Sequence, residues 1–396
     1  MSPLKRYYNL LRLDRKDIIQ IISYAIFAGI ISLSLPLGIQ AIINFIQAGR
    51  ASVSWIVLVI LVVIGVAFVG VLSLMQLRIT ENLQQKIFIR SAFEFTYRIP
   101  KLKFSSTYNK HSSEIANRFF DTLSIQKGTS KLLTDFSAAL LQILFGIILL
   151  SLYHPFFIIF GILLSILLYL IYRFSYESGL KTSLKESKFK YKVAGWLQEL
   201  SRNNFSFKNP HHLEFALEKN NRLVNDYINY REQHFRVIKR QFSQLIGFKV
   251  IITASLLLIG GFLVLNQQMN IGQFVAAEII ILLVINSVEK IILGLETFYD
   301  VLTSVEKIGE VTDLEIESES EVNQTNCFIN LSLELENVNF KFEDDTTNAL
   351  ENINLKINQS EKIVIEGDNG SGKTTLIRIL SGLIQPTQGH FIINDD

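Results

Sequence analysis

The chain has 396 residues, of which 49% are hydrophobic and only 19% are charged. A soluble globular protein carries about 25% charged residues, so the shortfall points to a membrane protein. The composition excludes an intrinsically disordered protein, and the single cysteine, Cys327, excludes a disulfide-stapled scaffold. The formal net charge of +2 argues against nucleic acid as a partner.

Long uncharged segments predict membrane-spanning helices. The hydrocarbon core of a bilayer, about 30 Å thick, needs about 20 helical residues. Each uncharged segment meets this length, and one of them is long enough for two helices with a turn at His154-Pro155. The segments without Asp, Glu, Lys or Arg are Ile18–Gly49, Ala51–Leu77, Phe136–Tyr172 and Val250–Ala277. The five spans predicted from them lie at about 18–47, 53–77, 136–153, 155–173 and 250–267.

A sixth span at 272–295 follows from charge topology. Glu278, Glu289 and Lys290 interrupt it, and its longest uncharged stretch, 279–288, is too short to span alone and also suits a buried soluble helix. Basic residues, however, gather before the first span and in the two long connections, whereas the opposite connections hold only Arg50. The positive-inside rule therefore puts the N-terminus and both long connections in the cytoplasm. A sixth crossing is needed to return the C-terminal segment to that side.

The first sixteen residues predict an amphipathic helix on the inner leaflet. Leu4, Tyr7, Tyr8 and Leu11 recur at helical spacing among basic residues. A plain solvated basic tail is the alternative. The long uncharged run that follows does not fit a secretory signal peptide, because it has no small-residue cleavage site.

The two cytoplasmic connections, 78–135 and 174–249, are too long for structureless loops, which rarely exceed about 15 residues. They predict membrane helices that continue into the cytoplasm, turn and return. About 25 helical residues would reach about 38 Å beyond the membrane. The turning tips are expected near 104–113 and 207–214.

The composition changes at about residue 312. Alternating acidic residues up to 327 predict a solvated linker, and from 328 apolar residues alternate with a period of two, as in half-buried strands. A turn is expected at Asp344–Thr347 between two such strands. Ile363-Val364-Ile365 predicts a fully buried strand.

Directly after that segment, residues 367–374 read GDNGSGKT and fit the phosphate-loop pattern GxxxxGK[ST]. Glycines let successive N–H groups point at phosphate oxygens, and the following helix adds its positive N-terminal end. Lys373 is expected to reach the β- and γ-phosphates and the Thr374 hydroxyl to bind Mg²⁺. Further phosphate contacts are expected from Gly367, Asn369, Gly370, Ser371, Gly372 and Thr375.

These features together resemble an ABC exporter half-transporter, a membrane all-α six-helix domain followed by a partial α/β phosphate-loop NTPase domain. Residues 335–342 (LENVNFKF) resemble the opening strand of the ATP-binding domain, and Phe342 falls where an aromatic ring stacks on adenine, although a core role is the alternative. Residues 349–355 and 385–389 also match. The implied organisation is an N-terminal segment 1–16, a transmembrane domain 17–311, a linker 312–327 and an ATP-binding segment 328–396.

The resemblance implies ATP and Mg²⁺ as cofactors, ATP-driven export, and a homodimer or a heterodimer with another half-transporter. The toxin-secretion subgroup of bacteria is the nearest in pattern. It implies a multi-pass protein of the bacterial inner membrane, in contact with lipid and with a possible periplasmic adaptor protein. The two tips would be the coupling helices. Glu114, Ile115 and Arg118 lie where exporters carry a Gly-Asp/Glu-hydrophobic-x-x-Arg stretch, with Ser113 in place of the glycine.

The family's signature sequence, second acidic strand with its catalytic carboxylate and switch histidine are not in the sequence. Leu380-Ser381-Gly382-Leu383 lies too close to Lys373 to be the signature. We therefore expect a partial chain with no catalytic residues of its own. The alternatives are a non-catalytic nucleotide-binding subunit that depends on a partner for hydrolysis and, opposed by the phosphate loop, a channel or membrane scaffold.

Charge and polar groups inside the spans suggest a pathway. Glu278 lies deepest in the sixth span and is the candidate pathway residue, because ionisable groups there are costly. Glu289 and Lys290 fit better at the cytoplasmic end. The polar residues Gln40, Asn44 and Gln76 fit two roles equally well, as pathway residues or as interhelical hydrogen-bond partners. The sequence does not specify the substrate.

Overall fold

The computed structural model describes residues 2–47, 53–104, 112–317, 331–342 and 347–394. It divides into two compact units, and each is described by itself. The first comprises Met1–Tyr97 and Ser113–Asp313, and the second comprises Arg98–Ser112 and Leu314–Asp396.

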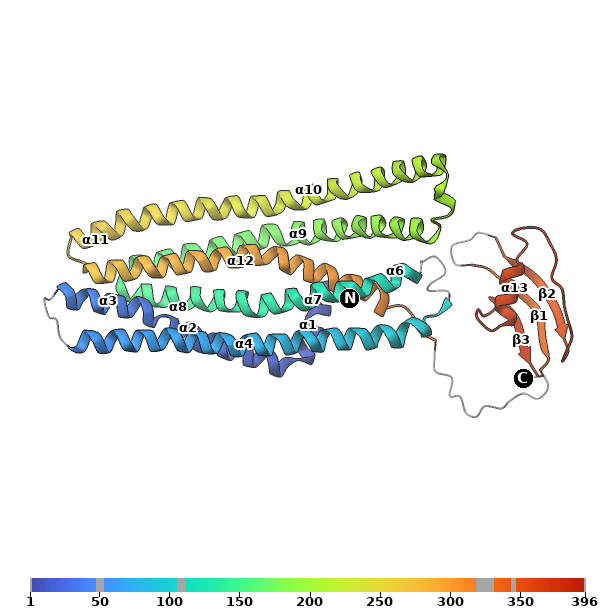
Figure 1. Ribbon diagram of the computed structural model, residues 1–396, viewed down its shortest axis with the longest axis horizontal. Coiled ribbons are helices and arrows are strands. Elements are labelled where there is room, and N and C mark those ends of the chain that lie inside the picture. The colour runs from blue at the N-terminus through green and yellow to red at the C-terminus, as the bar shows by residue number, and fades with distance from the viewer. Residues whose placement is uncertain (1, 48–52, 105–111, 318–330, 343–346, 395–396) are drawn as a thin grey trace. The chain divides into compact units, whose positions relative to one another are not determined.

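The first unit is a bundle of long helices (Figure 1). Among the described residues, six helical segments are long and apolar enough to cross a membrane, which confirms the predicted number of spans. The helix over 272–295 exists and is continuous, although its sequence is interrupted by charges. The main helices are α1 (Pro3–Leu13), α2 (Arg15–Ser32), α3 (Ser34–Gln47), α4 (Val53–Arg98), α7 (Asp121–Lys131), α8 (Ser137–Tyr153), α9 (Phe156–Arg202), α10 (Pro210–Ser255) and α12 (Ile271–Thr312).

Short elements join these helices. The first is the 3₁₀ helix η1 (Ile99–Lys101), and α6 (Ser112–Asn117) leads through η2 (Arg118–Phe120) into α7. The π-helical turns η3 (Leu132–Phe136) and η5 (Leu256–Gly260) join α7 to α8 and α10 to α11 (Gly261–Leu265). A hairpin forms at His154-Pro155, as predicted, where the His154 ring accepts a hydrogen bond from the Phe156 N–H at 3.2 Å.

The two long connections are helical over their described residues, as predicted. α9 and α10 run side by side to the turn at η4 (Ser206–Lys208), the second expected tip (Figure 1). There the Asn209 side chain caps α10 by accepting from the His211 N–H at 3.1 Å. Of the first tip, residues 105–111, including Tyr108, lie outside the described residues.

The bundle is built around α12. Two apolar clusters share this helix: one joins α8, α9 and α10 to it, and the other joins α1, α2, α4 and α7 to it. Close approach depends on glycines, because a methyl group at Gly128, Gly146 or Gly179 would overlap side chains of α12. Leu302 and Tyr299 on α12 are fully buried.

The N-terminal segment forms the predicted helix, but part of it packs on protein. Tyr7 is buried in the second cluster, and Arg6 pairs with Glu306 at 3.2 Å and with Asp313 at 2.6 Å. Tyr8, on the other side of α1, remains exposed and is available to the membrane surface. The helix is therefore fixed to α12 through one side.

Two of the polar groups predicted in the spans do join helices. The Tyr153 hydroxyl donates to Gln40 Oε1 at 2.6 Å, and Gln76 Nε2 donates to the Ile21 carbonyl at 3.0 Å. Such bonds satisfy polar groups that lipid cannot. Glu289 pairs with Lys249 on α10.

The second unit holds a three-stranded antiparallel sheet in the order β2-β1-β3. The strands β1 (Leu333–Phe340) and β2 (Leu350–Ile357) are the two predicted from alternation, and β3 (Gln388–Ile393) completes the sheet. The helix α13 (Lys373–Leu380) covers it through Ile379, which is fully buried with Leu335 and Val338. Most of the turn expected at Asp344–Thr347 lies outside the described residues.

The predicted strand at Ile363-Val364-Ile365 is wrong for this structure. The segment belongs to no strand, and Val364 is 79% exposed. An apolar strand is buried only between neighbouring strands. Within the described residues no strand lies beside this segment, since the sheet consists of β2, β1 and β3.

We predict that Gly179→Ala destabilises the bundle, because its methyl group would overlap the ring of Tyr299. Overpacking of this kind costs about 1–3 kcal/mol. Gly195→Ala on the same helix meets open space and should be neutral or stabilising by about 0.5–1 kcal/mol. Thermal unfolding of the purified protein in detergent measures both; equal midpoints would contradict the packing described.

Candidate phosphate-binding site

The phosphate loop lies between the extended segment after β2 and the first turn of α13. Gly370 and Gly372 have φ angles of 88° and 90°, in the left-handed region that favours glycine. At Gly372 an added Cβ would stand 2.5 Å from the Ala349 carbonyl oxygen and 2.8 Å from Leu350. The loop thus approaches the start of β2 too closely for any side chain at this position.

Lys373, the first residue of α13, folds back over the loop. Its Nζ donates to the carbonyl oxygens of Gly367 and Asp368, both at 2.7 Å. The Ser371 N–H also donates to the Asp368 carbonyl at 3.2 Å. These bonds hold the ammonium group at the mouth of the loop, where it would supply positive charge to an anion.

The first turn of α13 supplies further donors. N–H groups in the first turn of a helix have no intrahelical partner, so those of Lys373, Thr374 and Thr375 are available to an anion. The first helical hydrogen bond of α13 runs from the Leu376 N–H to the Gly372 carbonyl at 2.9 Å. Thr375 itself is buried and anchors the turn.

The residues present fit a nucleotide phosphate with Mg²⁺. Glycines without space for a Cβ, one ammonium group and free first-turn N–H groups form an anion-binding loop. Thr374 remains exposed, so its hydroxyl is accessible to a hydrated metal ion. Asn369 and Gly370 lie in the exposed turn of the loop. When bound, the metal would neutralise phosphate charge.

Phe342 and Glu278 are not part of this loop. The ring of Phe342 packs at right angles to Phe340, 4.8 Å between centroids, at the end of β1, and it remains half-buried. Both the adenine-stacking and the core role stay open to it. Glu278 lies half-buried on α12, in the other unit. The sequence 380–383, rejected as a signature, comprises the last residue of α13 and the turn after it, where the Leu383 N–H donates to the Arg378 carbonyl at 2.9 Å.

Sequence reasoning missed two contacts of the sheet unit. Phe104, at the first expected tip, packs on the sheet cluster, and the Arg378 guanidinium of α13 lies 4.7 Å from its ring centroid. The start of the acidic linker is exposed, as predicted, and it is also paired: Leu102 forms an antiparallel bridge with Ile316, and Lys103 pairs with Glu315 at 2.8 Å. The opposite charges of Lys103 and Glu315 are the signal from which sequence reasoning could have found the second contact.

The motif at Glu114 is paired within the bundle. Arg118 is buried and contacts Glu114 at 2.9 Å, Glu310 at 3.3 Å and the Tyr191 ring at 3.9 Å. Such a buried arginine is retained only with several partners. It ties α6 and η2 to α9 and α12.

Comparison with known sequences decides the family. The sequence profile described as the ABC transporter transmembrane region matches residues 18–288, and that described as ABC transporter matches residues 350–396. The chain belongs to the ABC transporter family. The resemblance to an exporter half-transporter is confirmed, and with it the six-helix membrane domain followed by the start of a nucleotide-binding domain.

Individual relatives agree with this assignment. The subtilin transport ATP-binding protein SpaT of Bacillus subtilis is 23% identical over 100% of this chain and 65% of its own length. The alpha-hemolysin translocation ATP-binding protein HlyB of Escherichia coli O157:H7 is 33% identical over 39% of this chain and 22% of its own length. This ABC transporter chain thus spans less than two thirds of the length of these relatives.

A solved structure shares the fold. A bacterial Atm1-family ABC exporter with ATP bound aligns with a TM-score of 0.73 at 16% identity, over 96% of this chain and 68% of that chain. The exporter fold is therefore shared by almost the whole transporter chain, including the short sheet.

We predict that Gly372→Ala abolishes nucleotide binding, since the methyl group has neither an accessible φ nor space beside Ala349. Gly382→Ala is the matched control, with a φ of 72° but open space around it. A fluorescent ATP analogue titrated into each purified variant measures the difference. Unchanged affinity in Gly372→Ala would contradict the loop geometry.

Proposed function

We propose that this chain is a subunit of an ATP-driven exporter and binds Mg·ATP at residues 367–375. Two features of one chain carry the proposal. Residues 18–288 match the ABC transporter transmembrane region, and the loop at 367–375 has no space for a side chain at Gly372. The roles proposed are phosphate binding by Lys373 and the loop N–H groups, and Mg²⁺ binding by the Thr374 hydroxyl. Phe342 is proposed to stack on adenine.

The exporter is proposed to work as a dimer, either of two copies or with another half-transporter, since six helices supply half of a pathway. Closure of the two nucleotide-binding domains on ATP would rearrange the membrane halves. Phe104 and Arg378 support this coupling, because they join the first tip to α13, the helix that begins at the phosphate loop. Glu278 is proposed to face the pathway.

The proposed location is the bacterial inner membrane, with the N-terminus and the nucleotide-binding segment in the cytoplasm. The excess of Lys and Arg in the two long connections supports this orientation. Relatives named for the transport of subtilin and for the translocation of alpha-hemolysin make an exported peptide or protein the proposed cargo. The resemblance to toxin-secretion exporters is our reason for adding a periplasmic adaptor as a second proposed partner.

Lys373→Ala tests the ATP proposal. We expect a loss of Mg·ATP affinity of at least about tenfold, because the variant removes the ammonium group held over the loop. Lys362→Ala, which removes an exposed charge ahead of the loop, should bind as the wild type does. Calorimetric titration is the measurement, and equal affinity of the two variants would overturn the role of Lys373.

A further inference from the structure

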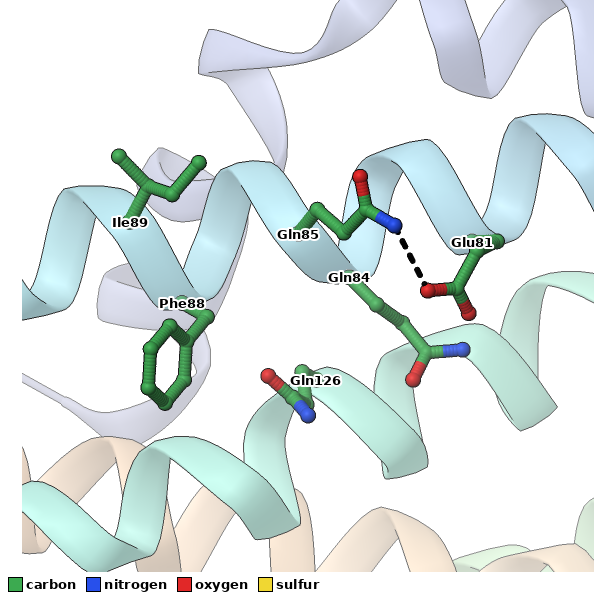
Figure 2. Close-up of a pocket in the computed structure, with 6 residues that line it drawn as sticks. All are labelled: Glu81, Gln84, Gln85, Phe88, Ile89 and Gln126. Carbon is green, nitrogen blue, oxygen red and sulfur yellow. Dashed lines mark hydrogen bonds between the residues drawn. The ribbon is translucent and has the colours of Figure 1, made fainter.

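A pocket of about 370 Å³ opens between α4 and α7 in the bundle (Figure 2). Most of its lining comes from α4, and Gln126 of α7 closes the opposite side. In Figure 2 the side chains of Gln84 and Phe88 lie on the side of α4 that faces α7, one on either side of Gln126. The residues that line it are Glu81, Gln84, Gln85, Phe88, Ile89 and Gln126.

The pocket residues form one face of α4 that the core does not use. The positions 81, 84, 85, 88 and 89 follow the helical spacing of three and four residues. Leu83 and Ile87, on the other face, are almost fully buried in the second apolar cluster. Burial thus explains Leu83 and Ile87. On the pocket face the Phe88 ring packs against Phe119, 5.4 Å between centroids, whereas Glu81 and Gln85 are exposed.

The lining presents one carboxylate, that of Glu81, and three side-chain amides, which carry N–H donors as well as acceptor oxygens. Gln126 Oε1 is buried and has no hydrogen-bond partner among the described residues. Glu81 uses one carboxylate oxygen to accept from Gln85 Nε2 at 2.9 Å, which orients the group and leaves its second oxygen available. None of the six residues is basic. A buried acceptor without a donor favours a ligand that donates.

The position of the pocket along α4 matters for its ligand. The uncharged run of this helix ends at Leu77, and Glu81 follows one turn later. Lys86 pairs with Asp17 at 2.5 Å and Arg90 with Asp14 at 3.0 Å, as expected for a segment that has left the hydrocarbon. The pocket therefore lies at the cytoplasmic surface of the membrane, where cytoplasmic cargo first meets the transporter.

We propose that this pocket binds the positively charged end of a lysine or arginine side chain on the exported peptide. Its ammonium or guanidinium group would donate to Glu81 and Gln126, and its aliphatic stem would lie along Phe88, whose ring also attracts a cation. The volume is within the range of small-ligand sites. This inference rests on the proposed function, since it names the class of cargo.

Binding is tested with the purified full chain in nanodiscs of phosphatidylcholine, which carries no primary amine. The probe is a fluorescein-labelled hexapeptide of alternating leucine and lysine, compared with the same peptide carrying norleucine in place of lysine. We expect only the lysine peptide to bind, and Glu81→Gln to weaken it about tenfold. Gln126→Leu should weaken it severalfold.

Glu218→Gln is the matched control, because it removes one exposed carboxylate on α10, away from the pocket. Glu81 is itself exposed, so its amide variant should fold, and thermal unfolding of each variant verifies this. Equal binding by Glu81→Gln and Glu218→Gln, or by the two peptides, overturns the proposal. Weaker binding of the lysine peptide when phosphatidylethanolamine, whose headgroup carries an ammonium group, is added to the nanodiscs would support a cation site.

The same preparations separate this inference from the proposed function. Lys373→Ala should lose Mg·ATP but retain the lysine peptide when no nucleotide is present. Glu81→Gln should bind Mg·ATP as the wild type does but lose affinity for the lysine peptide. Wild-type protein that binds ATP but not the peptide overturns the pocket assignment alone. Wild-type protein that binds the peptide but not ATP overturns the proposed function alone.

Discussion

The bundle depends on the close packing of α12 against its neighbours. In the 18-residue apolar stretch of α12 that could cross a membrane, 50% of the residues are buried. In the corresponding stretches of Arg15–Gln47 and Val53–Lys101 only 11% are buried. In lipid the hydrophobic effect does not drive helices together, so contact relies on small residues that let backbones approach. Gly146 provides this within a predicted span, and Gly128 and Gly179 allow the same close approach in the extensions beyond the spans. Gly309, on α12 itself, provides it toward Arg6 of α1.

This packing leaves polar residues for special tasks. Gln40 and Gln76 form hydrogen bonds between spans, and Arg118 joins α6 and η2 to α9 and α12. The face of α4 that carries Glu81 and its neighbours takes no part in either. A solvent-exposed polar face beside a pocket has no structural role that we can identify, and this motivates a ligand rather than a packing explanation.

Much of the fold was predictable because its signals are local. Uncharged runs gave five spans, charge topology added the sixth, and alternation gave β1 and β2. The strand at Ile363–Ile365 failed because burial of a strand depends on neighbours that its own sequence does not encode. The phosphate loop was recognisable from spacing, whereas the Phe104–Arg378 contact and the pocket on α4 join residues distant in sequence, and no local pattern marks them.

The central claim is a six-span transporter with its phosphate loop in the cytoplasm, and side-specific labelling tests it most directly. Gln268 lies between the fifth and sixth spans, and Lys208 lies at the α9–α10 turn. The variants Gln268→Cys and Lys208→Cys are made singly in a Cys327→Ser background. A membrane-impermeant maleimide is applied to intact cells and to inverted vesicles. We predict that Gln268→Cys reacts in cells and Lys208→Cys only in inverted vesicles. Reaction of both from the same side would contradict the account.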